Sequence, residues 1–220
     1  MNHRFFVVSG YCLLVGTLLL VGTMVLHPAG GSPDHIRRIT PLLMGSHALA
    51  IGSLPLLGFG CYGLAIRLAS PSRLATLALI TLFFGLLAGL IAATINGLTL
   101  PLFVANQPDT IAEQSQVKLI IRYGFLINKP MSYILMTCVT VSVGIWSALL
   151  LRRNDLPRWL GYGGVGLVGL GLLGVVLGYD FHGVGGFRLF VFALAGWLAG
   201  GGVLLIRTRP ADPATPAIVQ

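Results

Sequence analysis

The sequence predicts an all-α, polytopic bundle of membrane-spanning helices, and two observations lead there. Hydrophobic residues make up 55% of the 220 residues and charged residues only 9%, whereas a soluble domain carries roughly 25% charged residues so that water can wet its surface. The apolar residues also gather in long, nearly uncharged runs. Together these features exclude a soluble enzyme, a disordered protein and a nucleic-acid-binding domain.

Six of the runs are long enough to cross a membrane, because about 20 apolar residues span the hydrocarbon layer. Each run must be helical, since lipid offers no partner to an unpaired backbone N–H or C=O group. The predicted spans are residues 5–26, 41–66, 75–104, 131–151, 159–178 and 187–206. A domain over residues 1–209 would contain them all, followed by a disordered tail at 210–220.

The first run, from Phe5 to Leu26, is too long for the apolar core of a secretory signal peptide, which has about 7–15 residues. We therefore predict an uncleaved first span. Within the later spans, Pro55 is expected to kink the second helix, and Pro101 to kink or end the third.

The connection between the third and fourth spans is the one long loop. Thr110 and Glu113 have capping-box spacing, which predicts a helix from about residue 111 to 128 that stops before Pro130. Arg122 in its middle argues against a seventh span. We expect a short helix lying on the outer surface of the bundle or dipping into it.

The net charge of +8 is carried by basic residues at the ends of the apolar runs. The short loops 67–74 and 152–158 are strongly basic, and short basic loops face the cytoplasm. The sequence therefore predicts a plasma-membrane (inner-membrane) protein with both termini cytoplasmic. Its surroundings would be the lipid bilayer, and no nucleic-acid partner is expected.

Glycines are concentrated in the last two spans. In lipid, small residues let helix backbones approach closely, so they mark packing faces. We expect the fifth and sixth spans to pack as a tight hairpin, or to bind a second copy or a larger membrane complex, through Gly164, Gly171, Gly178, Gly196 and Gly200.

With this topology the polar residues gather toward the outer side. His47 lies about two turns inside the second span, where an ionisable side chain needs a polar partner such as Asn96. Met24 and His27, and likewise Met44 and His47, are spaced i, i+3 and share a helical face. Sulfur with imidazole suits copper or axial ligation of haem iron, although core packing explains methionines equally well.

Two outer loops offer further candidates. Asp180 and His182, two residues apart, suit a shared metal or an acid–base pair, or they form a polar turn. The adjacent Arg37 and Arg38 suit an anionic headgroup or substrate, or simply a solvated loop.

The turn before the fifth span, Arg152-Arg153-Asn154-Asp155-Leu156-Pro157-Arg158-Trp159-Leu160-Gly161, resembles the basic Leu-Pro-Arg-Trp-Leu-Gly turn of several uncharacterised bacterial multi-pass membrane protein families. The resemblance covers about ten residues. It implies a bacterial inner-membrane protein of six helices, and it carries no functional residue across.

Three functional hypotheses follow. The first is a protein that binds a small ligand or cofactor (copper, haem or a quinone) in the outer half of the bundle, through His27, His47, Asn96 and His182 with Met24 and Met44. The second is a non-catalytic subunit of a larger membrane complex. The third is a lipid-modifying enzyme or carrier that uses Arg37 and Arg38 for the headgroup and Asp180 with His182 for proton transfer.

Overall fold

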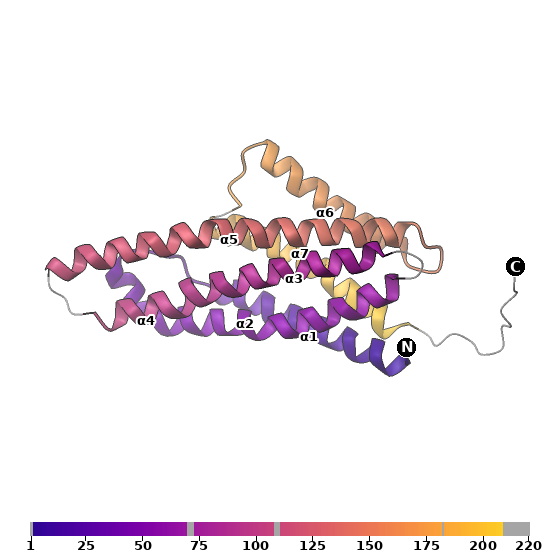
Figure 1. Cartoon of the computed structure of the whole chain (residues 1–220), viewed down its shortest axis with the longest axis horizontal. Helices are drawn as coiled ribbons and strands as arrows, with labels where there is room; N and C mark the ends of the chain where they lie inside the picture. Colours follow the sequence, from indigo (N-terminus) through magenta and orange to yellow (C-terminus); the bar gives the residue numbers. More distant parts are fainter. Residues whose placement is uncertain (1, 70–72, 108–110, 182, 209–220) are drawn as a thin grey trace, which may run out of the picture.

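A computed structural model describes residues 2–69, 73–107, 111–181 and 183–208, without the side chains of 111–114. All regular structure in these ranges is helical (Figure 1). The helices are α1 (His3–Leu26), α2 (Pro33–Leu68), α3 (Leu74–Thr94), the π-helix η1 (Ile95–Thr99), α4 (Leu100–Ala105), α5 (Ile111–Leu151), α6 (Arg158–Val176) and α7 (Val184–Ile206).

Within the described residues, six helical stretches are long and apolar enough to cross a membrane. This confirms the predicted six-span, all-α bundle and makes the chain a multi-pass membrane protein. His3 Nδ1 hydrogen-bonds to the Thr208 carbonyl oxygen at 2.8 Å, so the two chain ends lie at one end of the bundle, which we name the terminal end. The opposite end, where α2 and α5 begin and α4 ends, is the distal end (Figure 1). The predicted tail at 210–220 lies outside the described residues.

The predicted break before Pro130 is wrong, because α5 is one helix of 41 residues with Pro130 inside it. The part before the proline packs Val117 and Ile121 into a small distal core, and the part after it packs Val139 and Val143 into the main core. Burying apolar side chains on both sides of the proline outweighs one missing backbone hydrogen bond. The expected short outer helix is therefore the distal half of α5, and the predicted cap at Thr110 lies outside the described residues.

Two helices, α2 and α5, and the continuous stretch Leu74–Ala105 are longer than a membrane is thick and project at the distal end. At 1.5 Å per residue, the 41 residues of α5 reach about 61 Å and the 36 residues of α2 about 54 Å, against ~30 Å of hydrocarbon. The projecting parts of α2, α4 and α5 share the small distal core, formed by Ile36, Leu43, Leu100, Val104, Val117 and Ile121.

Pro101 shapes the third span without ending it. The π-turn Ile95–Thr99 lies directly before α4, and the Leu100 N–H donates to the Ile95 carbonyl, five residues back. A proline cannot donate to the carbonyl four residues earlier, and its ring clashes with that carbonyl. The wider π-turn removes the conflict, so the helix continues to Ala105.

The main core lies nearer the terminal end and is held by buried side-chain hydrogen bonds between helices. Trp146 Nε1 on α5 donates to the Ala75 carbonyl on α3 at 3.2 Å, and Trp197 Nε1 on α7 donates to the Leu160 carbonyl on α6 at 3.1 Å. The two indole rings stack with 6.2 Å between centroids. The main core therefore ties α3, α5, α6 and α7 together.

The predicted glycine packing face is confined to the terminal end. A Cβ at Gly164 would overlap Ser147 Oγ on α5, and a Cβ at Gly200 would lie 2.7 Å from the Trp159 ring on α6. A Cβ at Gly171, Gly178 or Gly196 would meet no other atom within 4 Å. Gly178 instead ends α6 with a φ of 72°, a conformation that glycine adopts without strain. Consequently the distal half of α6 stands away from the bundle (Figure 1).

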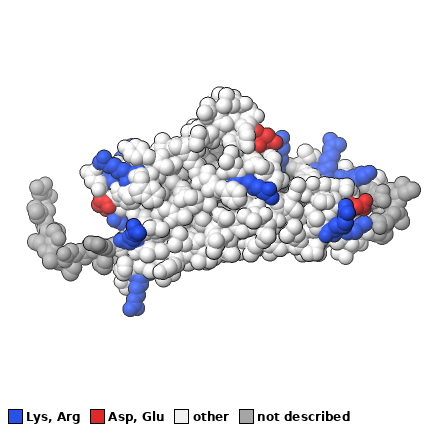
Figure 2. All heavy atoms as spheres, turned by 180° about the vertical axis from the view of Figure 1, so that it is seen from behind, with Lys and Arg blue, Asp and Glu red and all other residues white. Residues whose placement is uncertain are grey.

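Charge marks both ends of the long axis. At the terminal end, Asp155 accepts hydrogen bonds from Arg67 at 3.0 Å and Arg153 at 2.9 Å, which joins the end of α2 to the turn between α5 and α6. On the face shown in Figure 2, Lys and Arg lie at both ends and near the middle of the axis, with uncharged surface between them. The uncharged band on the terminal side of the middle suits a hydrocarbon layer.

Candidate functional site

The distal half of the bundle encloses a cavity of about 310 Å³, which we name the distal cavity. Its walls are mostly apolar side chains of α1, α2, α3, α5 and α7, including Leu20, Leu43, Leu54, Leu135 and Phe187. A few polar residues interrupt this apolar lining, namely Thr23, His27, His47, Asn96, Asn128 and Ser132. A concave apolar site with a small number of polar groups is the usual form of a small-molecule site.

Two histidines from different helices meet in this cavity. His27 directly follows α1 and His47 lies in α2, and their ring centroids are 4.8 Å apart. Both rings line the cavity. Both residues were predicted from the sequence as ligand-binding candidates, and the tertiary structure places their rings beside each other.

The hydrogen bonds of the two rings fix which nitrogen is available. His27 Nδ1 lies 2.9 Å from the Pro28 carbonyl oxygen, and His47 Nδ1 lies 2.8 Å from the Leu43 carbonyl oxygen. A carbonyl oxygen only accepts, so in a neutral imidazole each Nδ1 carries the hydrogen and each Nε2 carries a lone pair. The pair therefore offers two acceptor or metal-ligating nitrogens to a ligand.

Arg188 of α7 holds the end of α1 in position. Its Nε donates to the Met24 carbonyl at 3.0 Å and its Nη2 to the His27 carbonyl at 2.5 Å, which satisfies carbonyls left unpaired where the helix ends. Burial first, and then the neighbouring His47 ring, lower the pKa of His27 from 6.5 to about 4. His27 is therefore neutral at pH 7.

Gly97 allows the close approach of His47. A Cβ at Gly97 would overlap the His47 imidazole, so the ring lies directly on the backbone of the π-turn η1. Any larger residue would displace the ring. The π-turn thus serves as the floor on which His47 is held, and such turns are frequent at functional sites.

Asn96, in the same π-turn, has a buried amide that neither donates nor accepts a hydrogen bond. The amide oxygen lies close to Gly124 of α5, where a Cβ would be 3.4 Å away. The expected Asn96–His47 hydrogen bond is not formed, since His47 bonds to the Leu43 carbonyl instead and has Ser46 Oγ at 3.5 Å. Asn96 borders the cavity and would reach a ligand there after a side-chain rotation.

Three polar residues of the cavity, one each from α2, η1 and α5, lie at a similar depth. Counted from the terminal ends of α2, α3 and α5 at 1.5 Å per residue, His47, Asn96 and Asn128 lie roughly 31–35 Å along their helices. A hydrocarbon layer of ~30 Å would end just below them. With one face of the hydrocarbon layer at the terminal ends of these helices, the other face would fall close to the cavity.

The two methionines of the predicted metal set are separated. Met24 is buried and lines the cavity beside His27, whereas Met44 does not line it. Among the described residues, no group of three or more His, Cys, Asp or Glu side chains converges on a possible metal. Of the predicted metal set, His27, His47 and Met24 line the same cavity.

Those of the remaining predicted site residues that the structure describes lie outside the cavity. Arg37 donates to the carbonyls of Val104 and Gln107 at 3.4 and 3.1 Å, so it closes the end of α4. Arg38 and Asp180 are exposed and do not line the cavity, and His182 lies outside the described residues. The charged groups assigned to a headgroup or to acid–base work are thus not brought to the histidine pair.

Sequence reasoning missed Arg188, Gly97, Asn128 and Ser132. Counting helical rise from the basic end of each span would have placed Asn128 and Ser132 level with His47. Arg188 and Gly97 gave no such signal, because their roles depend on which helices are neighbours.

No protein-family model, curated protein or solved structure matches this chain. Its function is therefore argued from the site alone.

Proposed function

We propose that this protein binds a small amphipathic molecule in the distal cavity. The observation that carries the proposal is the His27–His47 pair, whose free Nε2 atoms belong to rings that line a mostly apolar cavity. An apolar body would lie against the leucines of the wall, and a polar head would meet the imidazoles. A volume of about 310 Å³ is at the small end for ligand sites, which suits a single-ring head or a short chain better than a porphyrin.

The hydrogen-bonding groups of the cavity favour certain polar heads on the ligand. Two acceptor nitrogens favour a group that donates, such as a hydroxyl, and Asn96 adds an amide that both donates and accepts. A quinol and a lipid with a hydroxyl-bearing or acidic head both have this build. Because the two imidazoles lie beside each other, protonation of one would disfavour protonation of the other.

The test is a binding titration on the full chain purified in a neutral maltoside detergent. A short-chain quinol and a short-chain phospholipid serve as probes, and His47→Leu is compared with His35→Leu, a histidine of the same helix outside the cavity. We expect one probe to bind, with loss in His47→Leu and no change in His35→Leu. Binding of neither probe, or equal effects of both variants, would refute the proposal. Near-stoichiometric copper that disappears in His47→Leu would instead make the pair a metal site.

A second candidate function, a subunit of a larger membrane complex, is favoured by α6. Its buried residues are Leu160, Gly161 and Gly164, all near the terminal end, and its distal half exposes Leu170, Val176 and Leu177 by more than 70%. Close contact with another membrane helix would cover this face. The mass of the protein extracted from its own membranes tests the idea, because a single chain without partners would contradict it.

A further inference from the structure

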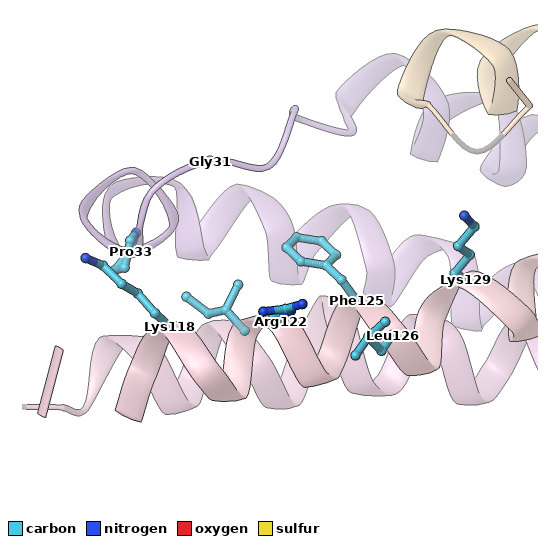
Figure 3. A pocket seen from close by; sticks show the side chains of 8 residues that line it. Gly31, Pro33, Lys118, Arg122, Phe125, Leu126 and Lys129 are labelled. Carbon is cyan, nitrogen blue, oxygen red and sulfur yellow. The ribbon is translucent and has the colours of Figure 1, made fainter. Parts of the chain in front are cut away.

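A second hollow, which we name the basic groove, adjoins the distal cavity. Its volume is about 390 Å³, and it lies between the distal half of α5 and the segment that joins α1 to α2 (Figure 3). Lys118, Arg122 and Lys129 line it on the α5 side together with apolar Ile121, Phe125 and Leu126, and Gly31 and Pro33 form the other wall. It therefore combines positive charge with an apolar floor.

The three cations share one face of α5. Steps of four and seven residues turn a helix through almost whole turns, so Lys118, Arg122 and Lys129 stay aligned along it. All three are exposed, and among the described side chains no carboxylate lines the groove. Asp34, which follows Pro33, has a carboxylate oxygen 3.8 Å from Arg37 Nη1. The groove is therefore a positively charged surface that attracts an anion.

The groove and the distal cavity meet at Phe125. This ring lines both hollows, and Gly30 of the cavity is followed directly by Gly31 of the groove. Measured along the axis of α5 at 1.5 Å per residue, the cavity residue Asn128 is about 9 Å beyond Arg122 and about 15 Å beyond Lys118. Because the two hollows adjoin at Phe125, one elongated molecule can occupy both of them.

We propose that the molecule bound in the distal cavity is anionic, with a phosphate-bearing head in the basic groove and an apolar tail among the cavity leucines. This rests on the proposed function and selects between its two ligand classes. Three cations spread over about 16 Å of helix suit a head with several charged oxygens better than a single carboxylate. Arg122 would bind two phosphate oxygens at once, and the lysines would act as point charges.

The experiment uses the full chain in a neutral maltoside detergent and isothermal titration with three probes. They are dihexanoyl phosphatidate, dihexanoyl phosphatidylcholine and inorganic phosphate. We expect phosphatidate to bind most tightly, because it alone has both a tail and an unshielded anionic head. Its affinity should fall as NaCl rises from 0.05 to 0.5 M, since exposed charges are screened.

Variants separate the possible outcomes. Arg122→Gln should weaken phosphatidate binding about fivefold, while Arg38→Gln, an exposed arginine outside the groove, should leave it unchanged. If phosphatidate binds equally to wild type and Arg122→Gln but is lost in His47→Leu, the cavity binds a ligand whose head is not in the groove, and this inference fails alone. If inorganic phosphate binds as tightly as phosphatidate, the groove is a site for a soluble anion and the shared ligand is refuted. If no amphiphile binds, the proposed function fails as well.

Discussion

The buried amide of Asn96 leads to a prediction about stability: replacing it by leucine should stabilise the protein. Asn96 Nδ2 and Oδ1 are both buried and have no hydrogen-bond partner. If the amide stabilised the fold, this substitution would lower the stability of the protein. If the amide serves a ligand, its unpaired polar atoms destabilise the ligand-free protein, and the substitution removes that destabilisation. The sign of the effect therefore reports the role of the residue.

The magnitude follows from the burial. An unsatisfied buried polar group costs about 1–3 kcal/mol, and leucine has a similar branched shape without polar atoms. The cavity beside Asn96 leaves room for the slightly larger side chain. We expect the free energy of unfolding to rise by about 1–2 kcal/mol in Asn96→Leu. Asn106→Leu removes an exposed asparagine whose Nδ2 donates to the Leu102 carbonyl at 2.9 Å, so this control should lose up to about 1 kcal/mol.

Unfolding is measured by titrating the detergent-solubilised protein with SDS and following tryptophan emission. Trp146 and Trp197 stack in the main core with 6.2 Å between centroids, so their emission changes when the core opens. A loss of 1 kcal/mol or more in Asn96→Leu would refute the reasoning, because it would show that the amide stabilises the folded state. A gain accompanied by weaker ligand binding would place Asn96 in the site.

Three further predictions concern the supports of the site. Gly97→Ala should destabilise the protein by about 1–3 kcal/mol, because the added Cβ would overlap the His47 ring. Gly52→Ala, whose Cβ would meet nothing within 4 Å, should leave the stability unchanged. In SDS titrations, adding His47→Ala to Gly97→Ala should restore most of the lost stability. The pKa of His27 is lowered from 6.5 to about 4 on folding, so the unfolded state binds more protons between these pH values. The free energy of unfolding should therefore fall by about 2–3 kcal/mol as the pH drops from 6.5 to 4. A stability that does not change over this pH range would contradict the burial of the ring. Hydrogen bonds from Arg153 and Arg67 hold the pKa of Asp155 well below its usual range. Its contribution to the free energy of unfolding is therefore present above about pH 4 and is lost in more acidic solution. Because this carboxylate is 51% exposed, Asp155→Asn should lower the stability by less than about 1 kcal/mol at pH 7.

The sequence by itself determined the class of the fold and the approximate position of the spans. Lipid imposes this, because a helix is the local structure that satisfies its own backbone and about 20 apolar residues set its length. His47 and His27 were recognisable for the same reason, since polar residues in or next to an apolar run stand out. The limit of local rules is visible at Pro130, where a strong helix-ending signal was overridden by packing on both of its sides.

Only the tertiary structure decided which of these residues form a site. His27 and His47 are neighbours because α1 and α2 pack together, and His47 reaches the π-turn because Gly97 has no side chain. Arg188 supports α1 from α7, more than 160 positions along the chain. Local spacing carries no information on which helices are adjacent, because helix order in a bundle is set by the summed fit of all packed faces. The site therefore results from helix packing, whereas His27, His47 and Asn96 were already recognisable as candidates in the sequence.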